Sequence, residues 1–152
     1  MNLSALRGHR RILVDTSVWI YHFEAHSALA TAAGRIVEAI EDGRFEGVVS
    51  ELTLLELAVR PLQLGRQDVA DEYEVLLDRF PNLQPVPISR DILLEAASVR
   101  ARHRLRTADA ITLATGILHG ATAAVTNDAG WRACSGIKTV LLSEMVSGSA
   151  AR

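Results

Sequence analysis

The sequence Ile12-Leu13-Val14-Asp15 is a short run of large apolar residues that ends in a carboxylate, and it predicts a buried strand. Further apolar runs of strand length occupy 45–49, 86–88, 123–126 and 138–142. Segments with a helical spacing of apolar residues separate these runs, and the clearest is Ala28–Glu41. Strands that alternate with helices, without short hairpin turns, are typical of a mostly parallel sheet. We therefore predict a single α/β domain in which helices flank both faces of a central sheet.

Polar caps and prolines predict where several helices begin and end. Ser89 is expected to cap a helix that continues to about residue 103, and Thr107 to cap the helix 108–119. Pro61 is expected to stop the helix 51–60, because proline lacks a backbone N–H. We expect the core to span about 11–142, with 1–10 and 147–152 loosely held.

The composition limits the class of protein. The chain has 152 residues, of which 49% are hydrophobic and 22% charged, and its formal net charge is −2. This length suits one domain, and this composition excludes a mainly disordered chain. The lone cysteine, Cys134, excludes an internal disulfide and fits a reducing cytoplasm. The longest charge-free segment, 110–126, contains two glycines, a histidine and four threonines, so we expect no membrane span.

Three acidic residues are expected at one edge of the sheet, where the carboxyl ends of parallel strands form ligand sites, and a fourth lies at the start of a helix. Asp15 ends the first strand, and Asp128 follows the strand 123–126 by two residues. Glu56 lies on the helix after the second strand, among leucines that leave little room for a solvated charge. Asp109 lies in the first turn of its helix. Each aspartate also has an ordinary interpretation, as a helix-start or turn residue.

The chemistry of such a cluster favours a bound metal ion. Neighbouring carboxylates repel one another and lose hydration, and a divalent cation removes that cost. Oxygen ligands without His or Cys nearby in the sequence favour a hard ion such as Mg²⁺ or Mn²⁺. Beside a phosphodiester, such an ion can activate water and stabilise the leaving oxygen. The four acids therefore suggest metal-assisted phosphodiester hydrolysis.

Four blocks of this sequence resemble the signature blocks of PIN-domain ribonucleases in order, spacing and context. They are Ile12-Leu13-Val14-Asp15-Thr16-Ser17, Ser50-Glu51-Leu52-Thr53-Leu54-Leu55-Glu56-Leu57, Thr107-Ala108-Asp109-Ala110 and Val125-Thr126-Asn127-Asp128. The resemblance extends over about 11–142. Within that family the chain is most similar to the VapC-type toxins of type II toxin–antitoxin systems, because it is one small domain.

The resemblance implies a cytoplasmic endoribonuclease that uses Mg²⁺ or Mn²⁺. It implies that the catalytic and metal-site residues are Asp15, Glu56, Asp109 and Asp128, supported by Thr16, Thr126 and Asn127. It also implies a homodimer and a cognate, VapB-like antitoxin that lies over an apolar groove. The helices 28–41 and 51–60 carry enough apolar surface to form such a groove.

Basic and aromatic residues near these blocks have two interpretations each. Four arginines precede the third block: Arg100, Arg102, Arg104 and Arg106. They form either a solvated helix end or a patch that binds RNA phosphates. Trp19 and Tyr21 could stack on unpaired bases, although packing in the core or against a partner is the commoner role of aromatic residues.

Two other functions fit the sequence less well. An aspartyl-phosphate phosphohydrolase would use Asp15 as nucleophile, but such enzymes usually carry a second Asp two residues later, where this chain has Ser17. A non-catalytic metal- or partner-binding module would use the acids only as helix caps and contacts. RNA cleavage and divalent-ion binding distinguish these hypotheses.

Overall fold

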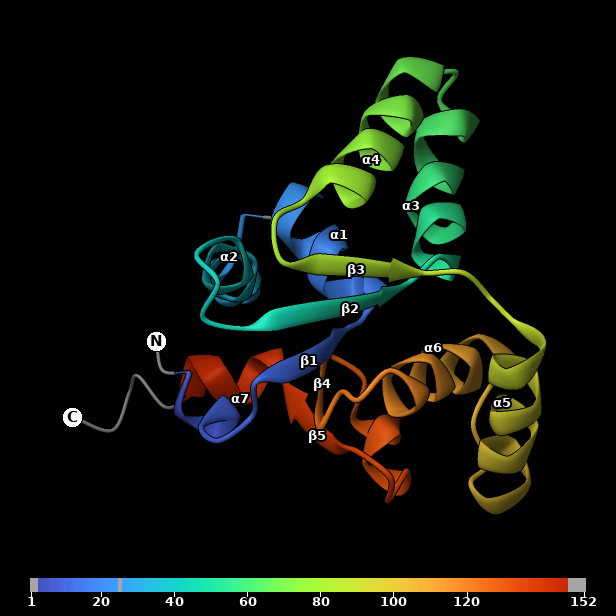
Figure 1. The fold of residues 1–152 in the computed structure, drawn as a ribbon. Helices are drawn as coiled ribbons and strands as arrows, with labels where there is room; N and C mark the ends of the chain where they lie inside the picture. Colours follow the sequence, from blue (N-terminus) through green and yellow to red (C-terminus); the bar gives the residue numbers. More distant parts are fainter. Residues whose placement is uncertain (1–2, 25, 148–152) are drawn as a thin grey trace.

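The computed structural model of the protein describes residues 3–24 and 26–147. A five-stranded sheet, in which all paired strands are parallel, forms its centre (Figure 1). The strands are β1 (Arg11–Val14), β2 (Glu46–Ser50), β3 (Leu83–Val86), β4 (Ala123–Thr126) and β5 (Lys138–Leu141). Their order across the sheet is β3-β2-β1-β4-β5. The carboxyl ends of β1 and β4 are therefore neighbours at the middle of one edge.

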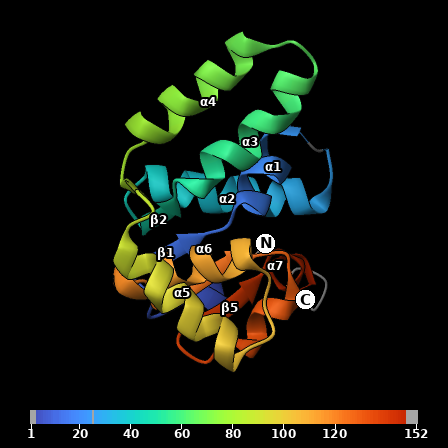
Figure 2. The ribbon, with the colours of Figure 1, turned by 90° about the vertical axis from the view of Figure 1, so that its right-hand side faces the viewer.

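Helices cover both faces of this sheet, as predicted (Figure 2). They are α1 (Thr16–Glu24), α2 (Ala28–Glu41), α3 (Leu52–Gln63), α4 (Gln67–Arg79), α5 (Arg90–Arg102), α6 (Thr107–Leu118) and α7 (Leu142–Ser147), with short 3-10 helices η1 (Ser4–Leu6) and η2 (Ala129–Ala133). Side chains alternate along β1: Ile12 and Val14 pack with α1, α2 and α7, whereas Leu13 packs with α5 and α6. None of the helices in the described residues is long and apolar enough to cross a membrane.

The prediction that Pro61 stops its helix is wrong. Helix α3 continues through Pro61 to Gln63 and forms, with α4, a pair that extends away from the sheet (Figures 1 and 2). Pro61 is buried, and its carbonyl accepts hydrogen bonds from the backbone N–H groups of Leu64 (3.0 Å) and Arg66 (2.8 Å). The helix ends within two residues, so the missing proline N–H disturbs only its last turn.

Three further differences concern the ends of elements. The third strand is Leu83–Val86 rather than 86–88, and it tolerates Pro85 because it lies at an edge of the sheet. Thr107 is the first residue of α6 rather than its cap, since the cap position belongs to Arg106. The segment before β1, which we expected to be loose, contains η1 and the fully buried Leu6. Ser147 ends α7, and 148–152 lie outside the described residues.

Candidate active site

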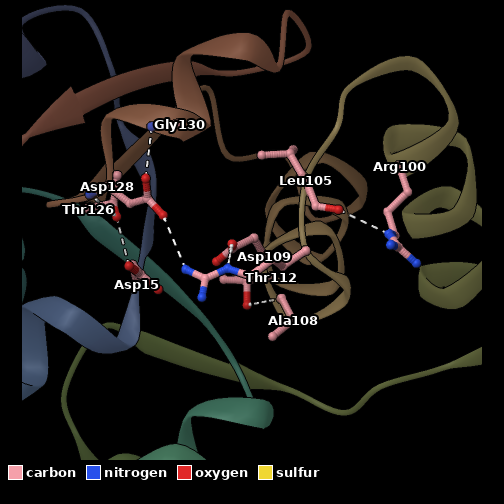
Figure 3. Close-up of polar contacts among 10 residues, drawn as sticks. Asp15, Arg100, Leu105, Ala108, Asp109, Thr112, Thr126, Asp128 and Gly130 are labelled. Atoms are coloured by element: carbon pink, nitrogen blue, oxygen red, sulfur yellow. Dashed lines mark hydrogen bonds and ion pairs between the residues drawn. The ribbon is translucent and has the colours of Figure 1, made fainter.

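Asp15 follows β1 at the central edge of the sheet, and neutral hydroxyl groups hold its side chain. Its Oδ2 accepts hydrogen bonds from Thr126 Oγ1 (2.7 Å), at the end of β4, and from Ser17 Oγ (2.8 Å) (Figure 3 draws the first). The same hydroxyl oxygens accept the backbone N–H groups of Asp128 (3.1 Å) and Asn127 (3.3 Å). Asp15 is therefore tied to the loop after β4 through two hydroxyl bridges.

Burial raises the pKa of Asp15 above its ordinary value. The hydrogen bonds from Thr126 and Ser17 act in the opposite direction, and the negative charge of Asp109 raises the pKa further. A carboxylate in this environment costs free energy when it is charged, so a positive charge bound nearby would stabilise it.

Glu56 reaches the same region from α3. Its Oε1 accepts a hydrogen bond from the buried Thr16 hydroxyl at 2.9 Å. Because Thr16 donates its single hydroxyl proton to Glu56, the hydroxyl of Thr53 donates to Thr16, at 2.8 Å. Partial burial of the carboxyl group raises the pKa of Glu56, and the charges of Asp15 and Asp109 add to this shift.

One expectation about Glu56 is wrong. Its leucine neighbours suggested that it has little room for solvation, yet the residue as a whole is exposed, and it is the carboxyl end beside Thr16 that is partly buried. Only Leu57 of those neighbours is buried, and Leu55 is 61% exposed. Residues on one helix face in several directions, so an apolar neighbourhood in sequence does not enclose the side chain.

Asp109 and Asp128 contact a guanidinium group at the rim of the site. Arg106 Nε lies 3.5 Å from Asp109 Oδ2, and Arg106 Nη2 lies 3.9 Å from Asp128 Oδ2. Figure 3 labels the two acids and draws both ion pairs as dashed lines. The other carboxylate oxygen of Asp128 accepts the backbone N–H of Gly130 at 2.8 Å and caps η2. Asp128 thus has the turn role considered for it and also faces Arg106.

Of the four arginines considered for RNA binding, one contacts the acidic residues. Arg100 donates to the carbonyl of Leu105 (3.0 Å), away from the acids in Figure 3. Arg102 pairs with Glu95 at 3.8 Å, and Arg104 is exposed. Arg106 alone of the four makes ion pairs with Asp109 and Asp128. Three of the arginines therefore fit the solvated helix end, and Arg106 belongs to the site.

The sequence of residues 12–136 matches the family profile of the PIN domain. The chain belongs to the PIN domain family. A comparison with curated proteins finds no match.

Solved structures with the same fold include toxin–antitoxin complexes. A toxin–antitoxin complex from Klebsiella pneumoniae has a chain that superimposes with a TM-score of 0.66 at 22% identity, over 86% of this chain and 97% of that one. VapBC2 from Rickettsia felis, bound to a promoter DNA fragment, gives 0.68 at 14% identity, over 86% and 98%. FitAcB from Neisseria gonorrhoeae gives 0.68 at 17% identity, over 87% and 98%. At these identities the likeness is one of fold.

The donors of this PIN domain fit a hard divalent cation in their chemistry. The site offers carboxylate and hydroxyl oxygens, and the charge of Asp109 raises the pKa of both Asp15 and Glu56. The guanidinium of Arg106 already lies beside Asp109 and Asp128, which shows that these two carboxylates attract positive charge. Within the described residues no three acidic, His or Cys side chains are placed to ligate one ion together. Mg²⁺ needs only one or two direct carboxylates, because it keeps several waters.

Sequence reasoning missed part of the hydroxyl network. Ser17 was named in the first block without a role at the site, but its hydroxyl donates to Asp15. Thr53 supports Thr16, and Tyr21 Oη accepts a hydrogen bond from the Asn127 side chain at 3.3 Å. Trp19 is fully buried, which settles its role as core packing. The positions of Ser17, two residues after Asp15, and Thr53, three residues before Glu56, were the available signals.

Proposed function

We propose that this PIN-domain protein is a Mg²⁺- or Mn²⁺-dependent endoribonuclease and the toxin of a toxin–antitoxin pair. The observation that carries the proposal is that hydroxyl groups hold Asp15, after β1, and Glu56, on α3, at one site, where the charge of Asp109 on α6 raises the pKa of both. Neutral hydroxyls, rather than cations, hold the two acids with raised pKa values. Membership of the PIN family and the fold shared with toxin–antitoxin complexes support the same function.

The proposed roles follow from the contacts. Thr126 and Ser17 both donate to Asp15 Oδ2, so Oδ1 keeps the lone pairs that neither hydroxyl uses. Thr16 orients Glu56 toward the same site. Asp128 completes the acidic set from the loop after β4, and Asn127 is fixed beside it through Tyr21. A divalent ion held directly by one or two of these acids, and through its waters by the others, would activate a water and stabilise the leaving oxygen of the RNA.

The proposed partners are an antitoxin and a second copy of the chain in the cytoplasm. The exposed face of the α3–α4 pair carries large apolar side chains, namely Leu55, Val59, Leu62, Leu64 and Val75. A cavity beside α3 and α4 has a mixed lining, in which Leu54, Val75, Leu77 and Pro85 alternate with the charged residues Glu51, Glu74, Asp78 and Arg79. This surface is suited to an amphipathic antitoxin segment. Of the two helices expected to form the groove, the one that contains Glu56 contributes exposed apolar side chains, whereas no large apolar side chain of 28–41 is exposed.

The proposal is tested by RNA cleavage with purified protein. Wild-type protein is expected to cleave RNA only when Mg²⁺ or Mn²⁺ is present, and Asp15→Asn is expected to abolish cleavage while the fold persists. The matched control is Asp68→Asn on α4, whose carboxylate pairs with Arg66, and it should cleave like wild type. Full cleavage by Asp15→Asn would refute the assignment. Transfer of a phosphoryl label to Asp15 would support the phosphohydrolase instead.

A further inference from the structure

Arg106 makes two contacts that no catalytic role explains. Its guanidinium lies 3.5 Å from one carboxylate, Asp109, and 3.9 Å from another, Asp128. The Arg106 side chain is 85% exposed, whereas those of Asp109 and Asp128 are 22% and 42% exposed. The acids are thus anchored in the site and the cation lies over them, in contact with solvent.

The backbone keeps this cation close to the acids. Arg106 occupies the cap position before α6 with an extended backbone, and its carbonyl accepts the N–H of Ala110 at 3.0 Å. Asp109 lies three residues later in the first turn of the same helix. The guanidinium is therefore tethered beside Asp109, but its side chain is free to turn outward when another cation takes its place.

The two contacts are long and exposed, so they are weak and easily exchanged. A divalent cation bound among the acids would repel the guanidinium and would compete with it for the same carboxylate oxygens. Conversely, the guanidinium offsets part of the repulsion between Asp109 and Asp128 when no metal is bound.

We propose that Arg106 is a built-in counter-ion that shares Asp109 and Asp128 with the divalent cation and must be displaced when that cation binds. This inference rests on the proposed metal-dependent function and adds that the protein itself weakens its metal affinity. The chain binds its metal less tightly than the same site would without Arg106.

The test is calorimetric titration of the full-length protein with Mn²⁺ at low ionic strength. Arg106→Gln is expected to lower the Kd for Mn²⁺ about two- to fivefold, the factor that corresponds to an exposed ion pair. Raising the salt concentration should shrink this difference, because screening weakens exposed charges. Arg106→Lys, which keeps the charge, should bind Mn²⁺ more weakly than Arg106→Gln does.

Arg104→Gln is the matched control, because it removes the same charge only two residues before Arg106. The Arg104 side chain is exposed and makes no ion pair in the described part of the chain. The Kd of Arg104→Gln should equal that of wild type. Equal or weaker Mn²⁺ binding by Arg106→Gln, or an equal gain in Arg104→Gln, would overturn the inference.

Failure of the proposed function gives a different result. If wild-type protein binds no Mn²⁺, or Asp15→Asn binds it as well as wild type, the metal site itself is refuted and the counter-ion role falls with it. If wild type binds Mn²⁺, Asp15→Asn does not, and Arg106→Gln shows no gain, only the role of Arg106 is refuted.

Discussion

Replacing Gly116 by alanine tests how α6 is seated on the sheet. A Cβ at this position would lie 2.8 Å from Leu13 Cδ2, 2.9 Å from Leu13 Cβ and 3.1 Å from Leu13 Cγ. Leu13 is fully buried in β1, and its Cβ is fixed to the strand, so a change of rotamer cannot relieve the contact. The helix must move away from the strand, and with it Asp109 from Asp15.

Two opposing effects set the magnitude. Alanine is favoured over glycine inside a helix by about 0.8–1.0 kcal/mol. Overpacking a core contact costs about 1–3 kcal/mol, and the fixed Leu13 Cβ places this contact in the upper part of that range. We therefore expect Gly116→Ala to lower the free energy of unfolding by about 1–2 kcal/mol. For a domain of this size this corresponds to a fall in Tm of about 2–8 °C.

The matched control is Gly34→Ala in the interior of α2. A Cβ added at Gly34 would lie 3.7 Å from its nearest neighbour, His22 Nδ1, which is an ordinary van der Waals contact. This variant should be more stable than wild type by about 0.5–1 kcal/mol. Thermal and urea unfolding followed by circular dichroism measures both variants. A Gly116→Ala protein as stable as wild type, or a Gly34→Ala protein that loses the same amount, would refute the packing argument.

Three shorter predictions concern the site. Asp15→Asn should raise the Tm in metal-free buffer at neutral pH, because its amide oxygen can still accept the two hydroxyl bonds and no desolvated charge remains. The raised pKa of Asp15 means that the folded protein holds this proton more tightly than the unfolded chain, so wild-type stability should fall as the pH rises above the ordinary carboxyl range. Thermal unfolding against pH should show a shallower slope for Asp15→Asn, and an unchanged slope would contradict the argument. Thr126→Val should reduce RNA cleavage about tenfold or more, since it removes a hydrogen bond to a charged group with little change in shape. Initial rates under saturating Mn²⁺ measure this effect. The control is Thr122→Val, at an exposed residue just before β4 whose hydroxyl contacts His9 instead of an acid. Saturating Mn²⁺ should raise the Tm of wild type but not of Asp15→Asn, as followed by differential scanning fluorimetry.

The sequence predicted the layers of the fold because its helices and strands have strong, simple periodicity. The bounds of α2, Ala28–Glu41, agree with the prediction, since its apolar residues repeat over fourteen residues. The central strand β1 was recognised because its residues are large and apolar, as expected of a strand buried on both faces. The end of α3 was mispredicted because burial of Pro61 outweighs a local rule about proline.

The site was predicted at the level of elements but not of contacts. Strand order is what brings Asp15 next to Thr126, and parallel sheets place such residues at one edge. The contact of Arg106 with two acids depends on the direction of a long side chain, which no sequence pattern specifies. For the same reason the sequence did not separate Arg106 from the three arginines before it.

The four acids of the site differ in the groups that contact them, and this difference bears on where a divalent cation could bind. In the described part of the chain, no Lys, Arg or His makes an ion pair with Asp15 or Glu56, and their side-chain hydrogen-bond partners are hydroxyls. A hydroxyl fixes the direction of a carboxylate without neutralising it, whereas an internal arginine would satisfy the charge and leave little for a ligand. The cation that the chain does supply, Arg106, lies at the exposed rim, where its ion pairs are weak. Asp15 and Glu56 therefore keep their negative charge for an external cation, and Arg106 supplies a counter-charge beside Asp109 and Asp128 that can leave.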